Sequence, residues 1–145
     1  MSEVPTRFVQ RRVAAFSETD AAGIVHFSNF FRWMEDCEHA FVRSLGLSVH
    51  ADLPDGAGYI GFPRVSATCD YLRPIRFEDE VEVTLTVVDR RTRSLRSGFE
   101  LRVVGADEPA ARGSTAVVCC EHRDGGGLVA IPLPAALQSV VVSPA

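Results

Sequence analysis

The sequence predicts an α+β fold in which one long helix packs on an antiparallel sheet. Three observations favour it: one long helical pattern in the first third, four later strand-like segments, and only turn-rich segments between those four. Strands that follow one another without intervening helices favour antiparallel pairing over a βαβ arrangement. Because 145 residues can form a substantial core, we expect a single domain over 1–145.

The first strand is expected over 7–16, RFVQRRVAAF, where Val and Phe are separated by polar residues. A loop follows at 17–27, and Ser28 can cap a helix. The helix is expected over 29–45, and Gly46 is typical of the residue after a helix end. Six residues at helical spacing form its apolar stripe: Phe30, Trp33, Met34, Cys37, Phe41 and Leu45.

The four later strands are expected over 60–72, 81–91, 95–104 and 114–122. Within the second of them, VEVTLTVV alternates apolar and polar residues before two valines end the run, as in a half-buried strand. The tail PAALQSVV predicts a helical turn. Since one helix covers only one face of the sheet, we expect a second copy to cover what remains, in a dimer or larger assembly.

Composition excludes several classes of partner. The net charge is −4 and no long Lys/Arg run exists, so nucleic acid is not expected. No apolar run approaches the ~20 residues that a membrane span needs, and the start MSEVPTRFVQRR has no signal-peptide pattern. The four cysteines lack CxxC spacing and are expected to be free thiols in the cytoplasm: Cys37, Cys69, Cys119 and Cys120.

One segment, ETDAAGIVHFSNFFRWMED, resembles the active-site segment of the 4-hydroxybenzoyl-CoA thioesterase family, the hotdog-fold acyl-CoA thioesterases. A second, ATCDYLRPIRFEDEV at 67–81, resembles the passage between the second and third strands of that family. The matching positions of the first motif are Glu18, Asp20, Ala21, Ala22, Gly23, Ile24, Val25, Phe27, Asn29 and Phe30. The resemblance implies a five-stranded antiparallel sheet wrapped around the long helix. It also implies a homodimer with a continuous sheet, often paired into a homotetramer, and a substrate bound between subunits.

The resemblance further implies an acyl-CoA thioesterase that hydrolyses a small aryl- or fatty-acyl-CoA. Asp20 would attack the thioester carbonyl as nucleophile or activate a water as general base, and the sequence does not separate these roles. The backbone N–H of Phe27, at a helix N-terminus, would stabilise the oxyanion. No cofactor is expected, because coenzyme A is part of the substrate. Without the motif, Asp20 would be read as a loop-capping acid.

Further candidates surround this pair. His26 stands where the family usually has an aromatic residue, so a ring that lines the acyl pocket is favoured over a proton shuttle. Glu35 matches an acidic position of the family's helix, with a structural salt bridge as the alternative. Glu38 lies nearer the apolar stripe and is expected to pair with an arginine at an interface. Arg91 and Arg93 are expected to bind the phosphates of coenzyme A, with a solvated turn as the alternative.

Three other interpretations of the sequence compete with this one. A metal site at Glu35, Asp36, Cys37 and His39 is disfavoured because no second helix supplies ligands. A hotdog dehydratase or hydratase has a His-Phe-Pro motif, but here Ser28 replaces Pro and Ala40 stands where those enzymes place an acid. A non-catalytic acyl-CoA or acyl-carrier sensor would bind the thioester without releasing free thiol. Thioesters of acyl carrier protein remain alternative substrates.

Overall fold

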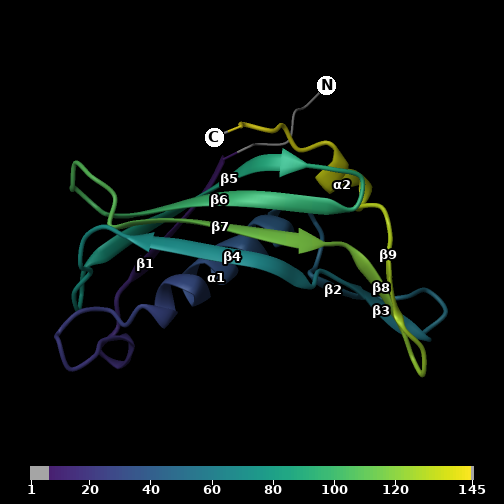
Figure 1. The fold of residues 1–145 in the computed structure, drawn as a ribbon, viewed down its shortest axis with the longest axis horizontal. Helices are drawn as coiled ribbons and strands as arrows, with labels where there is room; N and C mark the ends of the chain where they lie inside the picture. The colour runs from purple at the N-terminus through teal and green to yellow at the C-terminus, as the bar shows by residue number, and fades with distance from the viewer. Residues whose placement is uncertain (1–6, 145) are drawn as a thin grey trace.

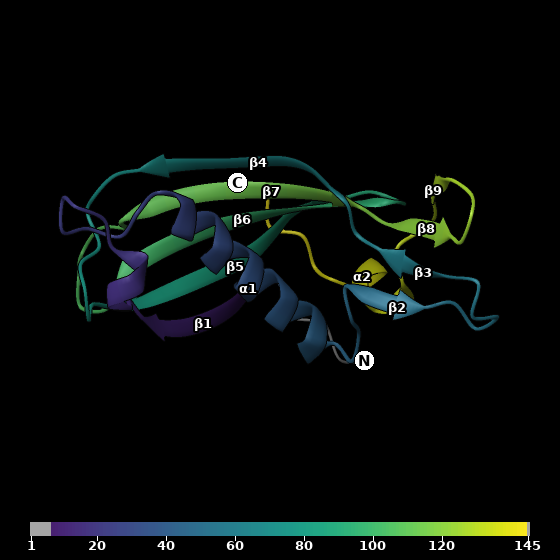
Figure 2. The ribbon, with the colours of Figure 1, turned by 90° about the horizontal axis from the view of Figure 1, so that it is seen from below.

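Five antiparallel strands curve around one long helix, as the sequence predicts. The computed structural model describes residues 7–144. The strand order of the large sheet is β1-β5-β6-β7-β4, and helix α1 lies along its concave face (Figures 1 and 2). The bounds are β1 Arg7–Val13, β4 Arg64–Tyr71, β5 Glu80–Arg90, β6 Ser94–Val103, β7 Ala111–Val118 and α1 Ser28–Ser44.

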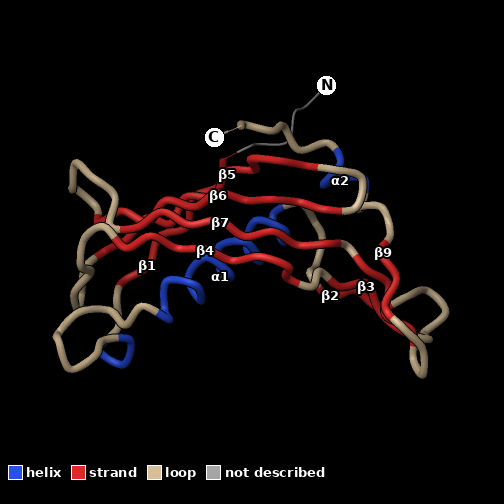
Figure 3. The backbone as a smooth tube through the Cα atoms, in the orientation of Figure 1, coloured by secondary structure: helices blue, strands red, loops and turns tan. Residues whose placement is uncertain are grey.

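A second, four-stranded sheet extends from one end of the first and was not predicted (Figure 3). Its order is β2-β3-β8-β9, with bounds His50–Asp52, Gly58–Gly61, Cys120–Arg123 and Leu128–Ala130. The predicted strand 60–72 is divided between the two sheets at Pro63, which has no N–H for a strand ladder. The predicted strand 114–122 is divided at Cys119 in the same way.

Two short helices complete the chain. The predicted first strand is too long at its end, because β1 stops at Val13 and a 3-10 turn, η1 Phe16–Glu18, follows. The predicted helical turn in the tail is confirmed as α2 Ala135–Gln138. No helix in the described part of the chain is long and apolar enough to cross a bilayer.

The core lies between α1 and the inner face of the large sheet. The predicted stripe of α1 is buried from Phe30 to Phe41, and Leu45 is half-buried. In β5 burial alternates, with Val81, Val83, Leu85 and Val87 facing the helix. β7 approaches α1 closely at Gly113, where an added Cβ would lie 2.6 Å from Sδ of Met34. This close packing fixes the height of α1 above the sheet.

One carboxylate enters this core. Glu38 of α1 is 6% exposed and is bound by both terminal nitrogens of Arg64, at 3.2 and 3.1 Å. The hydroxyl of Thr115 donates a third hydrogen bond to it at 2.8 Å. A buried charge needs such partners. The arginine partner was expected at an interface, but the pair forms within one chain because β4 lies beside α1.

Candidate active site

A tight hairpin carries Asp20 to the start of α1. The Asp20 N–H donates to the Ile24 carbonyl at 2.9 Å, and the Gly23 N–H donates back to the Asp20 carbonyl at 3.0 Å. Gly23 makes this turn with φ of +79°, a conformation that favours glycine. One carboxylate oxygen of Asp20 accepts the Ala22 N–H at 2.9 Å. The other has no protein donor within residues 7–144, so it is free to react.

Asp20 and Phe27 line the same cleft, which has a volume of about 600 Å³. The hairpin and the first turn of α1 form one wall, and the segment after β4 forms the other. Apolar residues from both walls line the same cleft as Asp20, among them Val25, Phe30 and Ile75. Two residues predicted from the motif are therefore brought together beside a mostly apolar space of a size that suits a small acyl group.

The N–H of Phe27 is an unused donor at the positive end of α1. The His26 carbonyl accepts the Asn29 N–H at 2.9 Å, so this carbonyl points into the helix. Because the peptide between His26 and Phe27 is trans, the Phe27 N–H points the opposite way. Among the residues that the structure describes, it has no acceptor. A free N–H at a helix N-terminus can bind a developing negative charge.

Tyr71, which was not among the predicted site residues, closes the other side of the cleft. Its hydroxyl donates to the Phe27 carbonyl at 2.9 Å, and its ring packs edge-on against Phe30 at 4.9 Å between centroids. Burial and then the Cys69 thiol raise the pKa of Tyr71 to about 12, so the hydroxyl keeps its proton at neutral pH. The segment 67–81 resembles a strand passage of the family, and Tyr71, one of its two aromatic residues, was the signal that could have predicted this contact.

His26 is not among the residues that line the cleft. Its Nδ1 lies 2.8 Å from the Ser28 hydroxyl and accepts the Ser28 N–H at 3.3 Å. Its ring packs on that of Phe27 at 4.4 Å, and it does not contribute to the cleft wall. This geometry suits a cap for the first turn of α1. The predicted pocket-lining or proton-shuttling roles of His26 stay predictions.

The remaining predicted residues lie outside the cleft. Glu35 is exposed and lies 3.5 Å from Arg64, which matches its salt-bridge alternative. Arg91 and Arg93 are exposed in the turn between β5 and β6, and Arg91 lies 3.4 Å from Asp89. Between 7 and 144 no group of three His, Cys, Asp or Glu residues could hold a metal ion.

The basic turn and the Asp20 hairpin lie at opposite ends of the large sheet (Figure 1). Val13, which precedes the hairpin, pairs with Glu80 at the start of β5, whereas Arg91 follows the end of β5. Eleven residues of strand separate them. At ~3.3 Å per residue this is about 35 Å. One chain alone therefore does not bring Asp20 and these arginines to one small ligand.

A family model described as the Thioesterase-like superfamily matches residues 14–141. A 1,4-dihydroxy-2-naphthoyl-CoA hydrolase of Synechococcus elongatus is 30% identical over 130 residues, covering 88% of this chain and 90% of the relative. A protein of Aquifex aeolicus described as an esterase is 38% identical over 80 residues, but that match spans only 55% of this chain and 60% of the relative. Among solved structures, the gentisyl-coenzyme A thioesterase BH1999 superposes with a TM-score of 0.75 at 29% identity, covering 90% of this chain and 98% of that one.

Proposed function

Because this chain belongs to the Thioesterase-like superfamily, we propose that it is a thioester hydrolase that cleaves acyl-CoA. Asp20 is the reacting carboxylate, and the Phe27 N–H is the oxyanion donor. The observation that carries the proposal is that Asp20 and Phe27 line one apolar cleft, and that one carboxylate oxygen of Asp20 and the N–H of Phe27 have no protein partner within 7–144. The relatives that share most of this chain's length and are named as thioester hydrolases support it.

The chemistry needs little more than these two groups. As general base, Asp20 takes a proton from water, and the oxygen of that water attacks the thioester carbonyl carbon. As nucleophile, Asp20 attacks that carbon itself and forms a mixed anhydride, which water then opens. In both routes the carbonyl oxygen becomes negative beside the Phe27 N–H. The C–S bond then breaks, and coenzyme A leaves as a thiolate that takes up a proton. Neither route uses a resident cofactor, and we propose none.

We propose an aryl-CoA as the preferred substrate. The named relatives act on 1,4-dihydroxy-2-naphthoyl-CoA and gentisyl-CoA, which both carry a hydroxylated aromatic acyl group. In this chain the rings of Phe27, Phe30 and Tyr71 border the cleft and meet edge to face. An aromatic acyl group can add to such a cluster with favourable geometry. A fatty-acyl chain would gain only apolar burial there.

We also propose that a second copy of the chain completes the site. The distance along β5 between Asp20 and the basic turn supports this, because Arg91 and Arg93 of the same chain lie too far away to bind the phosphates of a substrate held at Asp20. Strand β4 is an uncovered edge of the large sheet, and Val65 on it is 65% exposed. A homodimer that pairs these edges, with or without a further pairing into a tetramer, would supply the cations. The cytoplasm is the proposed compartment, since the four cysteines are free thiols.

A substrate panel with an Asp20→Asn variant tests the reaction. Free thiol is followed for aryl-, short-, long- and branched-acyl-CoA thioesters. Asparagine keeps the acceptor for the Ala22 N–H, so the hairpin is retained and only the reacting charge is lost. We expect kcat to fall by about 10²–10⁴, the usual worth of a positioned acid or base. Asp124→Asn, at an exposed position in the turn between β8 and β9, is the matched control and should keep full activity.

Three results would contradict the proposal, each in a different way. Tight acyl-CoA binding without free thiol from any thioester would support the sensor reading instead. Conversion of an enoyl-CoA to a hydroxyacyl-CoA without thiol release would indicate a hydratase. Turnover that survives in Asp20→Asn would remove Asp20 from the mechanism and leave the hydrolase reading intact.

A further inference from the structure

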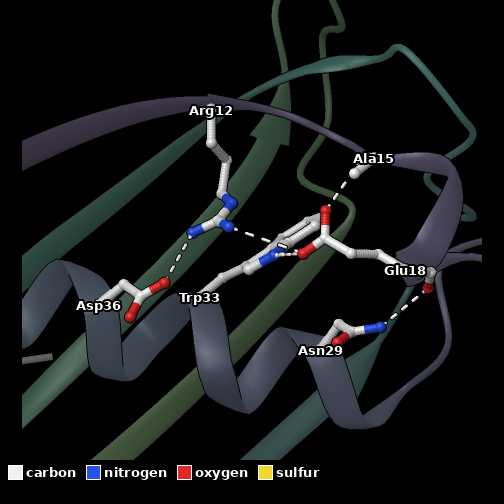
Figure 4. A network of polar contacts seen from close by, with 6 residues as sticks. All are labelled: Arg12, Ala15, Glu18, Asn29, Trp33 and Asp36. Carbon is white, nitrogen blue, oxygen red and sulfur yellow. Dashed lines mark hydrogen bonds and ion pairs between the residues drawn. The ribbon is translucent and has the colours of Figure 1, made fainter.

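Glu18, two residues before Asp20, binds three separate parts of the chain through its carboxylate (Figure 4). One oxygen accepts the indole N–H of Trp33 at 2.6 Å, and Arg12 lies 3.6 Å from the same oxygen. The other oxygen accepts the Ala15 N–H at 2.9 Å. The Glu18 side chain is only 18% exposed. It therefore joins β1, the 3-10 turn and α1 in a site that is mostly shielded from water.

The backbone of Glu18 holds the far end of the hairpin. Its carbonyl accepts the His26 N–H at 2.9 Å and the side-chain N–H of Asn29 at 2.8 Å. His26 directly precedes Phe27, whose N–H is the proposed oxyanion donor. Glu18 thus controls the position of both proposed reacting groups: Asp20 through two residues of chain, and the Phe27 peptide through the hydrogen bond to His26.

Arg12 balances the charge of this shielded carboxylate. Its guanidinium carbon lies 4.8 Å from the centre of the Trp33 ring, and one of its nitrogens binds Asp36 at 3.1 Å. Its Nε is buried and has no partner among the described residues. Partial burial of a carboxylate without a nearby cation would lower the stability of the fold. Because Arg12 supplies that cation, the Glu18 carboxylate can occupy this shielded position.

The network does not line the cleft. Neither Glu18 nor Arg12, Asn29, Trp33 or Asp36 borders the space beside Asp20. Its members act on the site only through Asp20 and Phe27. Their effect on catalysis must therefore come from geometry, since a misplacement of about 1 Å can slow a reaction by ~10²-fold.

We infer that Glu18 is a positioning residue, which holds Asp20 and the Phe27 N–H at fixed positions relative to each other. Its carboxylate does this by binding Trp33, Ala15 and Arg12, and its carbonyl by binding His26 and Asn29. This inference rests on the proposed function, because it assigns Glu18 a part in that reaction. It predicts a loss in kcat with little change in KM, since the substrate touches none of the network.

Glu18→Gln and Asn29→Asp test the inference. Glutamine keeps the size of Glu18 but offers one acceptor oxygen to the three donors. Aspartate keeps the shape of Asn29 and removes its donor, and a carboxylate is favoured at a helix N-terminus. We expect kcat to fall about 10- to 100-fold in both, with KM within about threefold of wild type. Glu82→Gln, which makes the same change to a carboxylate that pairs with Arg11 outside the network, is the control and should retain wild-type kcat.

Two further measurements separate positioning from a general loss of stability. Trp33 is the only tryptophan, so its single indole N–H resonance reports on the bond to Glu18 and should move upfield in Glu18→Gln. Hydrogen exchange at the amides of Asp20 and His26 should quicken in both variants, while amides of β5 and β6 stay protected.

The outcomes are distinct. A shifted indole resonance with unchanged kcat would overturn the inference. So would a loss of kcat that only matches a loss of folded protein, with exchange equally faster throughout the sheet. If wild type cleaves no thioester, the proposed function fails, and unchanged exchange at Asp20 and His26 in Glu18→Gln would then reject the anchoring role independently.

Discussion

At the scale of single residues, the candidate site is defined by the groups that the fold leaves unbonded. The Ser28, Asn29 and Phe30 N–H groups at the start of α1 all have acceptors, whereas the Phe27 N–H has none among residues 7–144. The motif predicted Asp20 and Phe27 as partners, and the structure places both in one cleft. It could not predict how the His26 ring turns, because that depends on where the Ser28 backbone lies after folding.

Phe27→Pro compared with Phe27→Ala tests the oxyanion donor directly. Phe27 has φ of −54°, which proline adopts without strain, and no hydrogen bond within the described chain uses its N–H. Proline should therefore remove the donor, with a fall in kcat of about 10²–10³ relative to the alanine variant. Both variants lose the aromatic ring equally. Steady-state kinetics on the preferred thioester measure the ratio, and equal kcat values would assign the oxyanion to another donor.

At the scale of elements, the spacing of apolar residues predicted where the long helix and strand β5 lie in the chain. It did not predict which strands belong to which sheet. The helix was expected over 29–45 and is Ser28–Ser44, because the apolar stripe and Gly46 mark its bounds. The alternation in β5 likewise survives in the fold. The second sheet was not predicted because 114–122 is one uninterrupted run without a glycine or proline to mark the point, at Cys119, where the chain passes from one sheet into the other. Its strands β2 and β9 have only three residues each, too few to show a period.

Gly113→Ala should disturb the contact between α1 and the sheet. An added Cβ would lie 2.6 Å from both the Met34 sulfur and the Thr68 carbonyl oxygen, and the second of these is backbone that cannot rotate away. We expect a loss of about 1–3 kcal/mol in the free energy of unfolding, as for other overpacked positions. Gly126→Ala, with open space around it, is the control. Urea denaturation measures both variants. Equal midpoints would contradict the prediction and show that β7 shifts away from α1 without loss of stability.

At the scale of the whole molecule, one chain carries the two halves of the proposed site at opposite ends. The family motif predicted the acid and the run of arginines predicted the basic turn, but their separation depends on the direction and length of β5. Two arginines that were not predicted as site residues also line the cleft beside Asp20. Arg73 is paired with Glu108 at 2.5 Å, whereas Arg76 has no ion pair within the described residues. These are the cations that one chain itself can offer near Asp20.

Mixing two defective variants tests whether a second copy supplies the basic turn. One variant is Asp20→Asn, and the other carries Arg91→Ala with Arg93→Ala. After subunit exchange, half of the dimers are mixed, and each has one intact site if Asp20 and the arginines come from different copies. Activity at limiting substrate should recover to about one quarter of wild type. As a control, Asp20→Asn is mixed with a chain that carries all three changes, where no intact site can form.

Absence of recovery, with subunit exchange verified by tagged chains, would mean that one chain binds the phosphates alone. Arg73 and Arg76 would then be the residues to change, because they border the cleft that contains Asp20.

The sheet order has a consequence for synthesis on the ribosome. β1 and α1 emerge first, yet β1 pairs only with β5, and Arg7 meets Thr86 across a long stretch of chain. The apolar stripe of α1 is covered by β5, β6 and β7, the last of which ends at Val118. Pairings between strands that are distant in sequence form slowly. Until they form, the exposed apolar surface can associate with other chains. The helix that carries the candidate site therefore stays partly uncovered until β7 has been synthesised.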